Sequence, residues 1–86
     1  YDVDGLKRRF EDMEREVERL LEMRGPQDQK LVLPAYDQVL KASHLFNLMD
    51  ARGAIAVAER QSYIGRIRDL CKRCALEWVD QERARA

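Results

Sequence analysis

The sequence predicts an all-α protein, an antiparallel bundle of three helices at residues of about 3–24, 34–49 and 57–83. Apolar residues make up 45 % of the chain and charged residues 37 %, with only four Gly and two Pro, a composition that favours amphipathic helices. Apolar side chains also recur at spacings of three and four along three segments, which is the period of a helix. A chain of 86 residues holds one hydrophobic core, so we expect residues 1–86 to form a single domain.

The first helix, at residues 3–24, is predicted from one continuous apolar stripe. This stripe consists of Leu6, Phe10, Met13, Val17 and Leu20. Asp2 or Asp4 is suited to cap the start of the helix, because a carboxylate accepts hydrogen bonds from first-turn N–H groups. Gly25 followed by Pro26 ends it.

The second helix, at residues 34–49, is predicted to begin at Pro34, whose fixed φ suits the first helical position. Its apolar face consists of Ala35, Val39, Ala42, Phe46 and Met49. Leu45 and Leu48 fall on the otherwise polar side, and a helix that is apolar nearly all round is usually buried by something. Two alternatives remain open for these leucines: the third helix closes over them, or they contact a partner.

The third helix, at residues 57–83, follows a turn predicted at Gly53, and its apolar stripe consists of Ile64, Ile67, Cys71, Cys74 and Trp78. Arg66 and Arg73 flank one side of this stripe, and Arg68 and Lys72 flank the other. Such residues commonly extend their charged ends from the edge of a core helix into water. They also suit contact with an RNA backbone or an acidic protein surface, and this second interpretation stays open.

The charge balance excludes a strong overall attraction to nucleic acid or to an anionic membrane. Sixteen Lys and Arg balance sixteen Asp and Glu. No apolar run approaches the roughly 18 residues of a membrane span, and the N-terminus lacks a signal-peptide pattern. We therefore expect a cytoplasmic protein without membrane contact.

No residue is predicted to be catalytic, to bind a cofactor or to bind a metal. Cys71 and Cys74 form a C-x-x-C pair in mid-helix, whereas a reactive thiol normally lies at a helix N-terminus and structural zinc needs four ligands. We expect both cysteines to be inert core residues. His44 has no Ser, Cys or acidic residue spaced as a relay, so a structural, hydrogen-bonded role is expected. The glycines are isolated and form no phosphate-binding loop.

Residues 33–68 carry several specific sequence pieces. These are Leu33-Pro34-Ala35-Tyr36, Lys41-Ala42-Ser43-His44, Phe46-Asn47-Leu48, Asp50-Ala51-Arg52, Glu59-Arg60-Gln61 and Tyr63-Ile64. In these pieces the chain closely resembles the C-terminal helical region of the bacterial glycyl-tRNA synthetase alpha subunit family. The first predicted helix and the tail beyond Leu70 resemble the family more loosely.

This resemblance implies a class II synthetase of alpha and beta subunits that activates glycine with ATP and Mg²⁺ and charges tRNA(Gly). In the family the aminoacylation core precedes this segment. Its arginine-bearing motifs match nothing here, so no catalytic residue is carried over. Because the chain opens at Tyr1, we expect it to be a piece of a longer alpha subunit and to be inactive in isolation.

The expected function is to support assembly with the beta subunit, to position tRNA(Gly), or both. The residues expected at such a contact are Arg66, Arg68, Lys72, Arg73, Leu45 and Leu48. A stand-alone helical module that binds protein or RNA is the alternative.

Two segments depart from the family pattern. Ala56-Val57-Ala58-Glu59 stands where the family usually has Ser-Val-Thr-Glu, so the Ser of a capping box is lost at the start of the third helix. The tail Glu82-Arg83-Ala84-Arg85-Ala86 replaces the usual ending, which leaves the role of that tail open.

Overall fold

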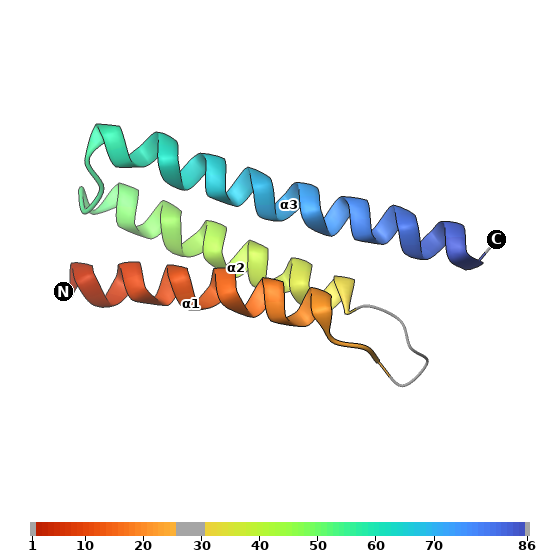
Figure 1. The fold of residues 1–86 in the computed structure, drawn as a ribbon. Helices are drawn as coiled ribbons and strands as arrows, with labels where there is room; N and C mark the ends of the chain where they lie inside the picture. Colours follow the sequence, from red (N-terminus) through yellow and green to blue (C-terminus); the bar gives the residue numbers. More distant parts are fainter. Residues whose placement is uncertain (1, 26–30, 86) are drawn as a thin grey trace.

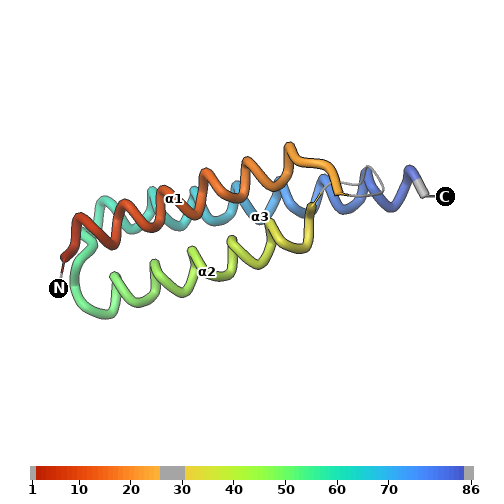
Figure 2. Tube along the Cα trace, turned by 90° about the horizontal axis from the view of Figure 1, so that it is seen from below, coloured from red at the N-terminus to blue at the C-terminus, as the bar shows by residue number. Residues whose placement is uncertain are grey.

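The computed structural model describes residues 2–25 and 31–85. These residues form three helices, α1 (Val3–Glu22), α2 (Val32–Ala51) and α3 (Val57–Arg85). Consecutive helices run in opposite directions and form an elongated bundle with Cα extents of 47 × 20 × 14 Å (Figures 1 and 2). The prediction of an all-α, antiparallel three-helix bundle is confirmed.

The predicted helix boundaries differ from the observed ones by a few residues. α1 ends at Glu22, and α3 continues to Arg85. α2 begins at Val32, so Pro34 is its third residue rather than its first. Proline is tolerated there because the N–H groups of the first helical turn have no acceptor within the helix.

The turn after α2 is built on Gly53, as predicted. Gly53 has a φ of 69°, a conformation that glycine adopts without steric cost. The Ala54 N–H donates to the Met49 carbonyl at 2.9 Å, and the Gly53 N–H donates to the Asp50 carbonyl at 3.1 Å. This pair of bonds is a Schellman motif, which ends α2 and directs the chain towards α3.

The first residues of α1 and α3 are capped differently from the prediction. Asp2 is the N-cap residue of α1, but its side chain makes no capping hydrogen bond and its carboxylate lies 3.8 Å from Arg8. At α3, the Ala56 N–H donates to the Glu59 carboxylate at 3.3 Å. Half of a capping box is therefore present even though Ala56 offers no side-chain acceptor.

An aromatic cluster forms the core where α2 turns into α3. The rings of Phe10 and Tyr63 meet edge to face with centroids 4.8 Å apart, and the Phe46 ring lies 5.9 Å from Tyr63. Phe10 is fully buried. Ala42, Leu45, Met49 and Ile55 complete this cluster. Such aromatic pairs stabilise a fold by more than the apolar area they bury, because the geometry of the rings also matters. The packing of this part of the core is therefore specific.

An aliphatic cluster forms the rest of the core, towards the other end of the bundle. Its members are Val17, Leu20, Leu21, Val32, Ala35, Val39, Leu70 and Cys74. The predicted apolar face of α2 is buried throughout. The predicted stripe of α3 is partly wrong, because Tyr63 and Leu70 are buried while Trp78 is 40 % exposed. Tyr63 and Leu70 are buried because α3 packs against both α1 and α2.

We call residues 2–13 and 46–66, around the aromatic cluster, the closed end of the bundle. Two ion pairs join its helices, Lys7 with Glu59 at 2.9 Å and Arg60 with Asp50 at 2.7 Å. We call residues 17–22, 31–40 and 67–85, around the aliphatic cluster, the open end. There α3 runs past the first residue of α2 (Figure 1).

Candidate functional site

An apolar groove lies at the open end between the first turns of α2 and the second half of α3. It arises because α3 has 29 residues and α2 only 20. The last turns of α3 therefore extend beyond Val32, where α2 begins, and their apolar side chains lack a full set of neighbours. Trp78 and Val79 remain exposed for this reason.

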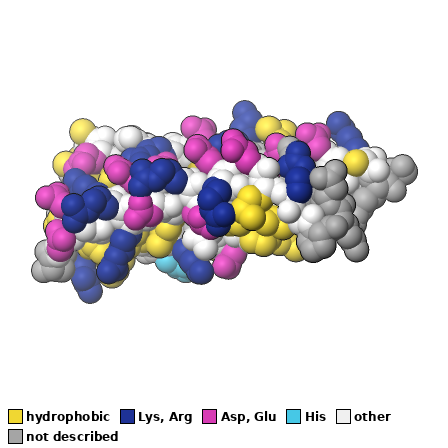
Figure 3. Space-filling view, turned by 60° about the horizontal axis from the view of Figure 1, so that its bottom comes forward, with side chains coloured by type: hydrophobic (Ala, Val, Ile, Leu, Met, Phe, Trp, Pro, Cys, Tyr) yellow, Lys and Arg dark blue, Asp and Glu magenta, His cyan; other side chains and the backbone are white. Residues whose placement is uncertain are grey.

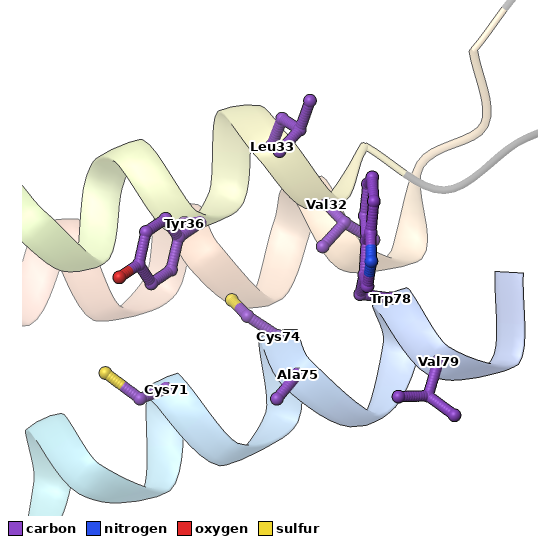
Figure 4. A pocket seen from close by; sticks show the side chains of 8 residues that line it. All are labelled: Val32, Leu33, Tyr36, Cys71, Cys74, Ala75, Trp78 and Val79. Atoms are coloured by element: carbon purple, nitrogen blue, oxygen red, sulfur yellow. The ribbon is translucent and has the colours of Figure 1, made fainter. Parts of the chain in front are cut away.

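The groove encloses about 310 Å³. It is lined by Val32, Leu33, Tyr36, Cys71, Cys74, Ala75, Trp78 and Val79. Figure 4 shows the Trp78 ring reaching from α3 to the level of Val32, and Cys74 pointing from α3 towards α2. Both walls are rigid helices, so the groove is preformed.

The groove is lined by apolar side chains and therefore suits an apolar binding partner. Its lining residues include no charged side chain, and the only side-chain polar groups are the hydroxyl of Tyr36, the indole N–H of Trp78 and the two thiols. Small-molecule sites usually add several convergent polar groups to an apolar wall, because those groups orient the ligand. This lining therefore favours apolar side chains of another protein segment over a charged substrate.

The two cysteines differ in their surroundings. Cys74 is buried in the aliphatic cluster, and burial raises the pKa of its thiol because the thiolate loses hydration. Cys71 is half-buried, packs against the same cluster and also lines the groove, so the predicted core position is confirmed for Cys74 and only in part for Cys71. Both cysteines are free. No group of three or more His, Cys, Asp or Glu side chains suited to a metal occurs in residues 2–25 and 31–85.

Arg66 is held inside the bundle by α1. Its guanidinium donates to the Glu14 carboxylate, with an Nε to oxygen distance of 2.8 Å, and lies 4.9 Å and 5.0 Å from the ring centroids of Phe10 and Tyr63. The hydrogen bond with Glu14 raises the pKa of Arg66. The charge and planar face of Arg66 are thus already engaged within the chain.

Arg73 also faces α1, and its guanidinium donates to Glu18 at 3.2 Å. Arg68 and Lys72 lie on the opposite flank of α3, are exposed, and form no ion pair with any described residue. The four basic residues singled out in the sequence therefore do not form one surface. They divide into an α1-side pair that is neutralised and a second pair that is not.

The two leucines singled out in α2 lie in different environments. Leu45 is buried in the aromatic cluster, so the core alternative holds for it. Leu48 is 40 % exposed and does not line the groove. His44 is exposed and no hydrogen bond to it is recorded among the described residues, contrary to the expected structural role.

An exposed apolar row on α2 was not predicted from the sequence; Leu33 and Tyr36 of this row line the groove, and Leu40 continues it beyond the groove. Leu33, Tyr36 and Leu40 follow one another at spacings of three and four and are all exposed. The available signal was that this row, added to the buried face, makes α2 apolar over more than half of its circumference. Figure 3 shows basic and acidic side chains interspersed elsewhere, on the face formed by α1 and α2.

A family model described as "Glycyl-tRNA synthetase alpha subunit" matches residues 1–83. The chain belongs to the glycyl-tRNA synthetase alpha subunit family. The match includes α1 and most of α3, so it extends the resemblance noted for residues 33–68. Membership gives the chain a role in a glycine–tRNA ligase, an aminoacyl-tRNA synthetase.

Among the described residues, the groups with shifted pKa values other than Cys74 belong to ion pairs. The pKa values of Lys7, Arg19 and Arg66 are raised and those of Glu16 and Glu59 are lowered, each chiefly by a hydrogen bond within an ion pair. Such groups stabilise the bundle and are not gathered around the groove. Among the described residues, no helix has the length and apolar character that a membrane span requires.

Proposed function

We propose that this chain is a docking module of the alpha subunit of a glycine–tRNA ligase, and that its groove binds the beta subunit. The observation that supports this most is the groove itself, whose walls are apolar and whose Trp78 is 40 % exposed. Large, partly exposed aromatic residues beside a preformed apolar recess are typical centres of protein interfaces. In this proposal the chemistry with glycine, ATP and Mg²⁺ takes place elsewhere in the alpha subunit.

A direct role in positioning tRNA(Gly) is favoured less by the contacts. Binding to phosphates needs cations that are free to exchange water and counterions for phosphate oxygens. Arg66 and Arg73, two of the four candidates, are bonded to carboxylates of α1. Among residues 2–25 and 31–85, no charged residue lines the groove. Placement of tRNA is then an indirect result of correct assembly.

The proposal is tested by a matched pair of substitutions in the alpha subunit, Leu33→Asp and Val57→Asp. Leu33 and Val57 lie in the first turns of α2 and α3 and are 65 % and 80 % exposed, but only Leu33 lines the groove. An acidic residue in a first turn interacts favourably with the helix dipole, so both variants should fold.

Affinity for the beta subunit is measured by calorimetric titration of each alpha-subunit variant. Leu33→Asp is expected to weaken binding about tenfold or more, because a carboxylate is desolvated at the contact. Val57→Asp should leave affinity within about twofold, as expected for a site outside the interface. Equal affinities for the wild type and both variants would rule out the groove as the docking site.

A further inference from the structure

The flank of α3 that faces α1 shows which contacts hold a neighbouring helix against α3. α1 carries Glu14 and Glu18 one turn apart, and they contact Arg66 and Arg73 on α3. The apolar stripe of α1 packs at the same time into the core. An amphipathic helix with two acidic residues is thus the element that fits this basic flank.

The opposite flank of α3 also carries two basic residues, but no acidic residues of a neighbouring helix pair with them among the described residues. Arg68, Lys72, Ala75 and Val79 follow one another at spacings of four, three and four, which places them along one face of the helix. Ala75 and Val79 line the groove, so Arg68 and Lys72 continue its α3 wall towards the closed end. Neither basic residue has an ion-pair partner among the described residues.

The α2 wall has the spacing that helix packing requires. Leu33, Tyr36 and Leu40 offer exposed apolar side chains at positions i, i+3 and i+7. A helix laid between this row and the face of α3 would bury both rows and complete a four-helix bundle. Asp37, an acidic residue next to Tyr36 in α2, already contacts Lys41 at 3.5 Å.

We infer that the groove binds an acidic amphipathic helix of the beta subunit, with its apolar stripe against α2 and α3 and two carboxylates, one turn apart, on Arg68 and Lys72. This inference rests on the proposed function and names the element that the groove selects. The apolar contact supplies most of the affinity, and the two ion pairs fix the direction and register of the bound helix.

The test is the double reversal Arg68→Glu with Lys72→Glu in the alpha subunit, with affinity for the beta subunit measured by titration at low and high salt. The matched control is Arg8→Glu with Arg9→Glu, an equal charge change at two exposed positions of α1. A charge-preserving exchange, Arg68→Lys with Lys72→Arg, is the second control. Arg68 and Lys72 form no ion pair with a residue in 2–25 or 31–85, so their reversal breaks no ion pair within that part of the bundle.

The double reversal is expected to weaken beta-subunit binding about tenfold or more at low salt and to reverse the salt dependence, because the rim then repels the acidic helix and added salt screens that repulsion. Both controls should stay within about twofold of the wild type. If Leu33→Asp disrupts binding while the double reversal does not, the groove docks the beta subunit but the acidic helix is wrong. A double reversal that weakens tRNA(Gly) binding and spares the beta subunit would assign these residues to RNA and overturn the inference.

Discussion

The closed and open ends of the bundle contain the same three helices but differ in the side chains that form their cores. At the closed end, three rings pack against one another, Phe10 is fully buried, and two ion pairs join α1 and α2 to α3. At the open end, aliphatic side chains form the core, and Trp78 lies at its edge with 40 % of its surface exposed. The aromatic cluster of the closed end is buried within this chain, whereas the groove at the open end leaves apolar side chains exposed.

Because of this difference, we expect the closed end to determine the stability of the fold and the open end to determine binding to a partner. Substitutions at the closed end should lower the free energy of unfolding, because they disturb contacts that are already satisfied. Substitutions in the groove should lower affinity for a partner while the fold persists, because their side chains are exposed in the free chain. The predictions below test this separation.

The largest expected effect is the loss of Phe10. Phe10→Ala should reduce the free energy of unfolding by about 3 to 5 kcal/mol, because it leaves a cavity beside Tyr63 and removes the ring under Arg66. Trp78→Ala at the open end should cost only about 1 kcal/mol, since the indole is partly exposed already. Urea denaturation of the 86-residue chain measures both, and equal losses would remove the distinction between the ends.

Two of the ion pairs between α1 and α3 should differ in the same way. Glu14→Gln is expected to lower the free energy of unfolding by about 1 kcal/mol, because Arg66 is half-buried and loses a charged acceptor. Glu18→Gln should cost at most about 0.5 kcal/mol, since Glu18 and Arg73 are both exposed. The same denaturation experiment checks this order, and a larger cost for Glu18→Gln would contradict it.

Completing the capping box should strengthen the closed end. Ala56→Ser adds a hydroxyl that accepts from the Glu59 N–H, while Glu59 keeps its bond to the backbone N–H of residue 56. The expected gain is about 0.5 to 1 kcal/mol in the free energy of unfolding. A thermal melt that shows no gain would place the N-cap of α3 elsewhere.

The smallest effect concerns pH. The bonds from Lys7 and from the Ala56 N–H lower the pKa of Glu59 below its ordinary value of 4.5. A lowered folded-state pKa adds stability above the unfolded value, and this stability is lost as the pH falls through the folded value. The stability difference between wild type and Glu59→Gln should therefore shrink below about pH 4.5. A difference that stays constant from neutral to acidic pH would show that Lys7 and Glu59 do not stabilise the closed end.

The sequence was sufficient for the helices that pack through one broad face. Most of the predicted α1 stripe and all of the predicted α2 face are buried, because an amphipathic period reports directly which side meets a core. The stripe of α3 was harder to predict. α3 contacts two helices, and the exposure of Trp78 depends on where α2 begins, which is a property of the packed bundle.

The candidate site was less predictable than the fold. The basic residues of α3 were identified, but Arg66 is paired with Glu14, 52 positions away, and no local pattern reveals such a partner. The groove was missed because Leu33 and Tyr36 belong to an apolar row that looks like core in the sequence.

The most direct test of the account is hydrogen exchange measured on the alpha subunit with and without the beta subunit. Binding should slow amide exchange in segments 33–40 and 68–79, which form the two walls of the groove. Exchange in segments 6–13 and 57–66 of the closed end should be unchanged, because those residues already have their partners within the chain. Slower exchange confined to the closed end, or no change in any of these segments within a stable complex, would contradict the account.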